Sequence, residues 1–368
     1  MDDLLYKIAF ASIRGMGVEL AQRLKEFIPD EREFFSMPEK NLKQIIGGRS
    51  RIHTTAYRNS KLIKAEKELK FLETKSIKSI YYTDSCYPQR LLEACDAPLM
   101  LYTLGNCDFN TKHVISMVGT RHCTSYGQRM CDDLVKQLKD SLKDIVIISG
   151  LAYGIDIASH RACLRHDVPT IAVMAKGLNS IYPAEHRNDA IAILNSHGAV
   201  LTEYLSSDEI TKGNFLARNR IIAGMADCTV IIESASSGGS LVTASLANSY
   251  NRDVFAVPGR VGDEFSKGCN GLIRHNKAMS ITCADDIIDA MRWENLQSRN
   301  PPQQIELFPT LSAEEQKIVD FLKMEGDSHI NTISSKLNMP VYRVLSTLVE
   351  LDCKGVIITM PGSRYAIH

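Results

Sequence analysis

Six short apolar runs divide the middle of the chain, and segments of helical length separate them. The runs occupy residues 113–119, 144–150, 169–175, 199–204, 228–234 and 253–259. Runs of this length, rich in valine and isoleucine, are typical of strands buried on both faces. Because strands alternate with helices along this region, the pattern predicts a doubly wound, mostly parallel α/β sheet.

The flanking regions follow helical patterns. Residues 4–70 have helical spacing throughout, which predicts an all-helical N-terminal domain. The region from residue 310 fits three helices and a hairpin that turns at Pro361–Gly362, the arrangement of a winged-helix domain. A stretch rich in proline and glutamine, 300–309, predicts a linker between that domain and the α/β region.

Each flanking region contains one element that could contact DNA. Residues 13–24, "IRGMGVELAQRL", have the two-glycine turn of helix–hairpin–helix units, although a structural turn between helices explains it better when taken alone. The recognition helix of the winged-helix domain offers only Arg343 near its start, with Lys354 beyond its end. A helix that reads a DNA groove usually presents several polar or basic side chains, so protein contact and DNA reading both stay open.

The residues that follow the six apolar runs predict a binding site. Ligands of doubly wound sheets bind beyond the carboxyl ends of the strands, so we expect these residues to come together. They are small residues, hydroxyl side chains and basic groups, which suit a polyanion. The candidates are Gly119, Thr120, Arg121, Ser149, Gly150, Lys176, Arg218, Asn219, Arg220, Gly238, Gly239, Ser240 and Thr243.

The segment "SGLAYGIDIASH", 149–160, is the clearest phosphate candidate. Its glycines, Gly150 and Gly154, lie between a buried strand and the start of a helix. Free backbone amides at such a helix N-terminus attract an anion, most often a phosphate. We therefore expect this turn to hold a phosphate.

Charge and cysteine content add little to this prediction. Lys and Arg number 43, as do Asp and Glu, so no overall field favours nucleic acid or membrane. Residues 40–70 hold nine basic residues against Glu66 and Glu68, which fits either a solvated helical face or a phosphate-tracking patch. Ten cysteines without a C-x-x-C pair, an acidic start and no apolar run of 18 residues predict a cytoplasmic protein with reduced thiols and no membrane span.

The sequence does not predict catalysis. The chain has no P-loop, no G-x-G-x-x-G and no G-x-S-x-G motif. Asp156 and His160 lie four residues apart on one helix, but an acid at a helix start and a packed histidine explain them better than an acid–base pair. Glu203 and Glu233 are the other acids near strand ends. We expect no catalytic residue, no metal site and no cofactor.

Five segments, in order, carry a family resemblance. They are "MVGTRHCTSYG", "SGLAYGIDIASH", "TIAVMAKGLNSIYP", "FLARNRIIAGMADCTVIIESASSGGSLVTA" and "RDVFAVPG…SKGCNGLIRHNKA". Together they resemble the DNA-processing protein A (DprA/Smf) family of bacterial natural transformation and recombination. The resemblance implies an extended Rossmann domain that binds single-stranded DNA without sequence preference, forms a homodimer and recruits the RecA recombinase.

The resemblance also implies domain limits. The chain would comprise a helix–hairpin–helix or SAM-like domain at 1–70, the extended Rossmann domain at 77–292, a linker at 293–309 and the winged-helix domain at 310–368.

The resemblance implies a DNA pocket made of residues that already follow the predicted strands. It would use Arg121, the Ser149–Gly150 turn, Asn219, the turn at 238–240 and Thr243. The sequence departs from the family at Ala184, where several members have a lysine. Arg187 or Lys176 would then supply the missing charge.

The predicted function is that of a single-stranded DNA-binding recombination mediator, which protects the strand and loads RecA onto it. The alternative is a nucleotide sensor or a phosphoribohydrolase-like enzyme on the same Rossmann variant. Such enzymes carry P-G-G-x-G-T-x-x-E, with the acid after the glycines, and the corresponding position here is Leu246. The missing acid argues against cleavage of a glycosidic bond.

Overall fold

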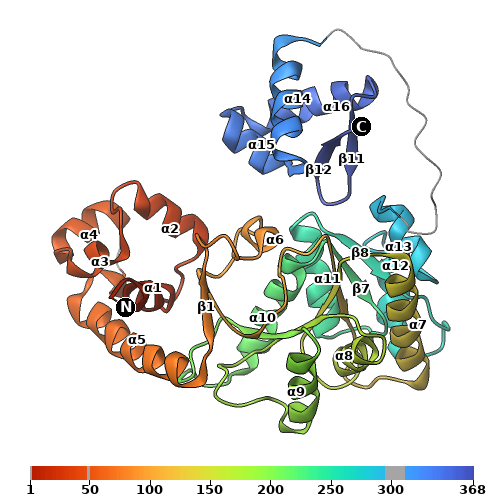
Figure 1. Ribbon diagram of the computed structural model, residues 1–368, viewed down its shortest axis with the longest axis horizontal. Helices are drawn as coiled ribbons and strands as arrows, with labels where there is room; N and C mark the ends of the chain where they lie inside the picture. Colours follow the sequence, from red (N-terminus) through yellow and green to blue (C-terminus); the bar gives the residue numbers. More distant parts are fainter. Residues whose placement is uncertain (1, 48–49, 295–310) are drawn as a thin grey trace.

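The computed structural model describes residues 2–47, 50–294 and 311–368, and Figure 1 shows three domains. The expected linker at 293–309 lies mostly outside the described residues, as does Arg49. The N-terminal domain contains α1 (Asp2–Ala11), α2 (Val18–Lys25), α3 (Glu31–Ser36), α4 (Glu39–Ile46), the 3-10 helix η1 (Arg51–His53) and α5 (Thr55–Lys75).

One member of the basic run at 40–70 is part of the N-terminal core. The Arg58 side chain is buried, and its guanidinium donates to the carbonyls of Phe34 at 2.6 Å, Phe35 at 3.0 Å and Met37 at 2.7 Å. These carbonyls lie at the C-terminal end of α3, where a helix leaves its last acceptors unpaired. Arg58 therefore closes α3 and is unavailable to a phosphate.

The α/β domain is built on a nine-stranded sheet with the order β1-β2-β6-β5-β4-β3-β7-β8-β9. The strands are β1 (Lys78–Tyr81), β2 (Met100–Gly105), β3 (His113–Val118), β4 (Ile145–Ser149), β5 (Thr170–Val173), β6 (Ala199–Thr202), β7 (Cys228–Ile231), β8 (Asp253–Ala256) and β9 (Met279–Ser280). The six apolar runs correspond to β3–β8, which pair with one another in parallel. The doubly wound, mostly parallel sheet is confirmed, and β1, β2 and β9 extend it beyond the expected strands.

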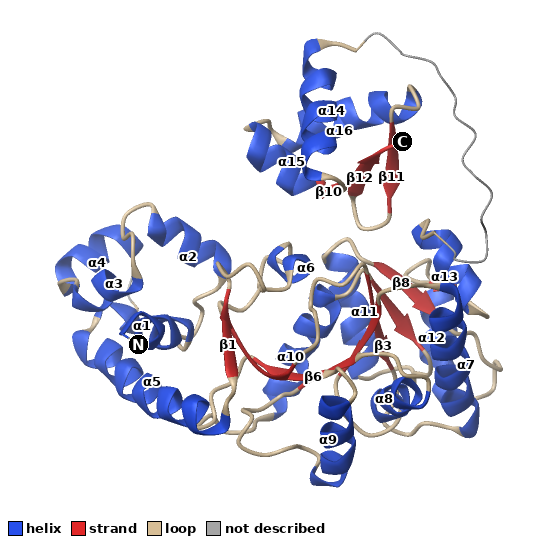
Figure 2. Ribbon diagram, viewed as in Figure 1, coloured by secondary structure: helices blue, strands red, loops and turns tan. Residues whose placement is uncertain are grey.

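Helices cover both faces of this sheet (Figure 2). They are α6 (Gln89–Leu92), α7 (Ser125–Ser141), α8 (Ile155–Arg165), α9 (Arg187–Asn195), α10 (Lys212–Met225), α11 (Gly239–Ser249), α12 (Lys267–Arg274) and α13 (Ala284–Met291). Short 3-10 helices, η2 (Ala184–His186) and η3 (Glu264–Ser266), precede α9 and α12. Side chains alternate along β3: Ile115 joins the core beneath α7 and α13, whereas Val114 joins the core that contains α10 residues.

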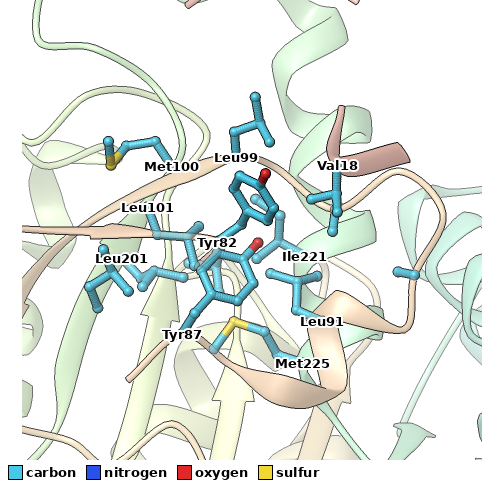
Figure 3. Close-up of a cluster of buried hydrophobic side chains, with 14 of the residues drawn as sticks. Val18, Tyr82, Tyr87, Leu91, Leu99, Met100, Leu101, Leu201, Ile221 and Met225 are labelled. Atoms are coloured by element: carbon cyan, nitrogen blue, oxygen red, sulfur yellow. The ribbon is translucent and has the colours of Figure 1, made fainter. Parts of the chain in front are cut away.

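The N-terminal domain and the sheet share one apolar core. Val18 of α2 lies beside Tyr82 and Leu99, next to the sheet edge (Figure 3). Two polar contacts reinforce this junction: Tyr81 Oη donates to Glu31 at 2.7 Å, and the Ser206 amide donates to buried Glu68 at 2.9 Å. The two domains therefore pack as one unit.

The C-terminal domain, residues 311–368, has a core of its own. It contains α14 (Ala313–Glu325), β10 (Ser328–His329), α15 (Ile330–Leu337), α16 (Val341–Cys353), β11 (Ile357–Met360) and β12 (Arg364–Ile367). Its three strands form an antiparallel sheet in the order β10-β12-β11, and three helices pack on it. This agrees with the three helices and hairpin expected from the sequence.

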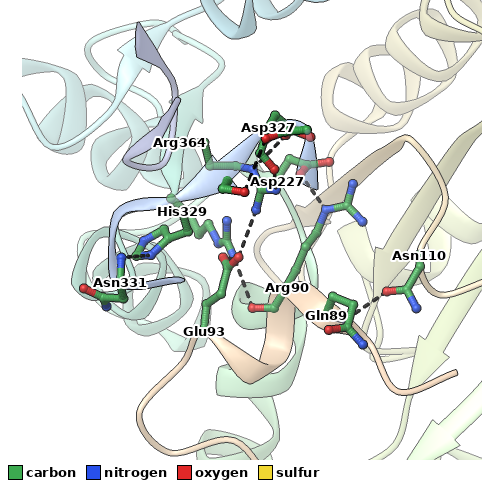
Figure 4. Close-up of polar contacts among 12 residues, drawn as sticks. Gln89, Arg90, Glu93, Asn110, Asp227, Asp327, His329, Asn331 and Arg364 are labelled. Atoms are coloured by element: carbon green, nitrogen blue, oxygen red, sulfur yellow. Dashed lines mark hydrogen bonds and ion pairs between the residues drawn. The ribbon is translucent and has the colours of Figure 1, made fainter. Parts of the chain in front are cut away.

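Charged side chains join the C-terminal domain to the α/β domain. Glu93 accepts from Arg364 of β12 at 2.9 Å and from Arg252, just before β8, at 2.5 Å (Figure 4). Arg364 also pairs with Asp327 at 3.0 Å. We call Glu93, Arg252, Asp327 and Arg364 the ionic junction; it lies near the amino ends of β7 and β8. Within the described ranges, no helix is long and apolar enough to cross a membrane.

Candidate nucleic-acid interface

A cavity of about 600 Å³ opens at the carboxyl ends of β3 and β7, between α8, α10 and α11. Its lining is mixed, with basic groups, hydroxyls, glycines and aromatic rings. The predicted site residues in the lining are Gly119, Thr120, Arg121, Arg218, Asn219, Gly238, Gly239, Ser240 and Thr243. Those outside the lining are Ser149, Gly150, Lys176, Arg187 and Arg220.

Two exposed cations at this cavity have no carboxylate partner. Arg121 follows β3, and its guanidinium lies over the ring of Phe215, 5.6 Å from the ring centroid. Lys212 begins α10. Throughout the described part of the chain, neither makes an ion pair. Both charges are therefore available to an anionic ligand.

The first turn of α11 presents free backbone donors to the same cavity. Gly238 and Gly239 are exposed, and the helix start has no side-chain cap. No acceptor from the described residues reaches the amides of Gly239 and Ser240. Asn219 Nδ2 and Thr243 Oγ1 both donate to the Gly239 carbonyl, at 3.2 and 3.0 Å, which fixes this turn. A fixed turn with free amides at the positive end of a helix is suited to an anion.

The corresponding turn before α8 is already filled by the protein. The pKa of Asp156 is raised, because the effect of burial exceeds the opposing effects of Arg218 and of the Ala152 and Gly150 amides. Arg218 Nη1 lies 3.9 Å from Asp156 Oδ2, and the Ile155 amide donates to the Thr120 carbonyl at 3.1 Å. The anion that faces the α8 turn is therefore the carboxylate of Asp156.

Ser149 and Gly150 consequently form the floor beneath the cavity. Ser149 is fully buried, and its hydroxyl donates to the Met117 carbonyl at 2.7 Å. Gly150 is covered by the guanidinium of Arg218, which would collide with a Cβ at this position. Direct contact of these two residues with a ligand, as expected from the sequence, does not fit this geometry. Arg218 covers them and lines the cavity instead. Its Nε and Nη1 have no hydrogen-bond partner in the described chain.

Three predicted cations also lie outside the lining. The Lys176 ammonium donates to Ser180, and Arg187 is exposed at the start of α9. Arg220 pairs with Glu203 and lines a different cavity, of about 890 Å³, that the N-terminal turn at Gly15 and Gly17 also lines.

The acids considered for chemistry have structural partners. Besides the Asp156–Arg218 and Glu203–Arg220 pairs, Glu233 accepts two hydrogen bonds from Thr124. Burial lowers the pKa of His160 to about 3, and its Nδ1 lies 2.8 Å from Thr170 Oγ1. His160 is thus a neutral, packed side chain, and none of these groups is placed as an acid–base pair.

Two aromatic rings at the cavity were missing from the predicted site. Tyr182 is 48% exposed, and its ring centroid lies 5.6 Å from that of Phe215. Both rings line the cavity, and Phe215 lies one turn after the start of α10. For Phe215, the sequence did contain a signal: it is an aromatic residue in the polar segment "TKGNFLARNR", where a core residue is not expected.

Comparison with known proteins supports the resemblance. DNA processing protein A of Streptococcus pneumoniae is 38% identical over 216 residues, which are 59% of this chain and 75% of that protein. Its solved structure superposes with a TM-score of 0.66 at 30% identity, covering 78% of this chain and 97% of the other.

A solved structure of the Helicobacter pylori protein, which concerns its single-stranded DNA binding mode, has a TM-score of 0.52 at 28% identity. It covers 58% of this chain and 94% of the other. The model of the family "DNA recombination-mediator protein A" matches residues 78–292, more than half of the chain. The chain therefore belongs to the DNA recombination-mediator protein A family, known as DprA or Smf.

Proposed function

We propose that the chain binds single-stranded DNA in the cavity at β3 and β7, protects it and loads a RecA-type recombinase onto it. One observation carries this proposal: unpaired cations, free helix amides and two aromatic rings, of exposed Tyr182 and half-buried Phe215, line the same cavity. A strand of DNA needs such a combination, because its phosphates and its bases are bound by different groups.

The phosphate contacts would come from three places. Arg121 and Lys212 supply charge at the rim, and the first turn of α11 supplies backbone donors. Arg218, although it faces Asp156, adds a guanidinium at the floor whose Nε and Nη1 make no hydrogen bond within the described chain. None of these groups reads the sequence of bases, so binding is expected to be sequence-independent and sensitive to salt.

The base contacts would come from Tyr182 and Phe215. Stacking of a base on an aromatic ring contributes about 1–3 kcal/mol and tolerates any base. The H. pylori relative, whose structure concerns single-stranded DNA, supports this choice of ligand. RecA loading, homodimer formation and a cytoplasmic site of action follow from the family resemblance.

The alternative ligand is a small nucleotide, because about 600 Å³ is also the size of a small-molecule pocket. Fluorescence anisotropy with labelled oligonucleotides of increasing length, and with mononucleotides as competitors, separates the two. We expect affinity to grow with length and mononucleotides to compete poorly. A mononucleotide that competes as well as an oligonucleotide would support the sensor.

Incubation with nucleotides and single-stranded DNA, with and without Mg²⁺, tests the absence of cleavage. We expect chromatography to recover the substrates intact. Multiple turnovers, lost in Asp156 or His160 variants, would make the protein an enzyme.

A further inference from the structure

We propose that Glu233, which does not line the cavity, is a positioning residue that sets DNA affinity through Arg121. This inference rests on the proposed function. Glu233 follows β7 and directly precedes the segment that leads to α11, and its side chain is 4% exposed. It therefore lies where the two walls of the cavity meet.

Glu233 holds both ends of the loop that carries Arg121. Its main-chain carbonyl accepts from the Thr120 amide at 2.7 Å. Its carboxylate accepts from the Thr124 amide at 2.9 Å and from the Thr124 hydroxyl at 2.5 Å. Because Arg121 lies between these two anchors, the loop has little freedom to move its guanidinium away from the cavity.

The surroundings make room for this carboxylate. Gly127, in the first turn of α7, lies against it, and a Cβ there would collide with the Glu233 carboxylate. Thr124 is the N-cap of α7 and accepts from the Gly127 amide at 3.3 Å, so the same residue joins loop, helix and carboxylate. The positive end of α7 favours a negative charge here.

A buried carboxylate is a costly way to fix a loop. No Lys, Arg or His of the described residues forms an ion pair with Glu233, and burial of an unpaired charge is unfavourable. Glu233 lies between the loop that carries Arg121 and the segment that leads to α11, which hold two of the phosphate contacts proposed above.

A double-mutant cycle tests the link. Single-stranded DNA affinity is measured at several salt concentrations for wild type, Arg121→Ala, Glu233→Ala and the double variant. We expect Glu233→Ala to lose most of what Arg121→Ala loses, with the salt slope reduced by up to about 0.7 in each. The double variant should bind no worse than Arg121→Ala, because both changes remove one contact. Glu233→Gln should retain most of the affinity.

Hydrogen exchange separates this proposal from the DNA-binding proposal. In the absence of DNA, Glu233→Ala should lose protection at the Thr124 amide, which donates to the carboxylate, and keep it in α10. If wild type fails to bind DNA, the proposed function is wrong. The exchange data still show whether Glu233 holds the loop that carries Arg121.

Three results would overturn the positioning role: wild-type protection of the Thr124 amide, an unchanged salt slope in Glu233→Ala, or losses that multiply in the double variant. Should Glu233→Ala not fold, Thr124→Val removes the hydroxyl contact to Glu233 together with the α7 cap, and Thr124→Ser should restore both.

Discussion

The two ends of the sheet differ in the carboxylate partners of their arginines. At the amino ends of the strands, Arg90 pairs with Asp227 at 2.5 Å, and Arg252 and Arg364 share Glu93 in the ionic junction. At the carboxyl ends, Arg218 and Arg220 pair with Asp156 and Glu203, but Arg121 has no carboxylate partner among the described residues. Among the paired arginines, Arg364 joins the C-terminal domain to the α/β domain, whereas the unpaired Arg121 is free to bind a ligand. The partners of an arginine, more than its position near a strand end, indicate its role.

The largest effect is expected from breaking the ionic junction. Glu93→Ala would leave Arg252, whose side chain is 2% exposed, without its carboxylate. Removing one partner of a buried pair costs about 3–5 kcal/mol. Urea unfolding should show this loss with DNA affinity unchanged. As a control, Asp327→Ala removes an exposed partner of Arg364 and should cost less than about 1 kcal/mol. Equal losses in both variants would contradict the comparison.

Arg121→Ala should weaken DNA binding at the opposite end, uniformly across sequences. Loss of one phosphate contact lowers the log–log salt slope by roughly 0.7. Anisotropy titrations at several salt concentrations measure both quantities. Lys143→Ala is the control, because Lys143 is an exposed cation just before β4, at the amino ends of the strands. A folded Arg121→Ala protein with wild-type slope and affinity would remove Arg121 from the site.

Beneath the cavity, His160 should affect stability and leave binding within a few fold. Its folded pKa of about 3 lies below the ordinary value of 6.5, so the unfolded chain binds more protons between these values. This contribution is complete above pH 6.5 and declines as pH falls toward 3. In His160→Ala, the fall of unfolding free energy with acid should be less steep by up to about 1.4 kcal/mol per pH unit.

Asp156→Asn should also bind within a few fold, because an amide oxygen can still accept from the turn. For His160, the test is the dependence of unfolding free energy on pH. If this dependence is the same in wild type and His160→Ala, burial does not lower the pKa of His160.

The smallest effect is expected from deleting residues 305–368. The C-terminal domain is joined at the amino ends of the strands, away from the cavity, so most single-stranded DNA affinity should remain. A gel shift with single- and double-stranded oligonucleotides measures it. A loss of more than tenfold would show that this domain is a main DNA site and would abolish the contrast between the two ends.

The sequence predicted the parts of the fold that depend on local pattern. The apolar runs correspond to β3–β8, and nine of the residues predicted from their ends line the cavity. It did not predict β1 and β2, because their antiparallel pairing joins short segments across α6. It also placed Ser149 and Gly150 in contact with ligand, since chain order shows which residues end a strand but not that Arg218 covers them.

The core shared by the N-terminal domain and the sheet has a consequence for shortened forms of the protein. Val18, Leu72 and Tyr82 belong to one apolar cluster that runs from the helices to the sheet edge. A chain that began at β1 would expose this cluster to water and would tend to aggregate. Removal of the C-terminal domain uncovers mostly charged groups, which water solvates. Evolution can therefore discard or exchange the C-terminal domain more easily than the N-terminal one.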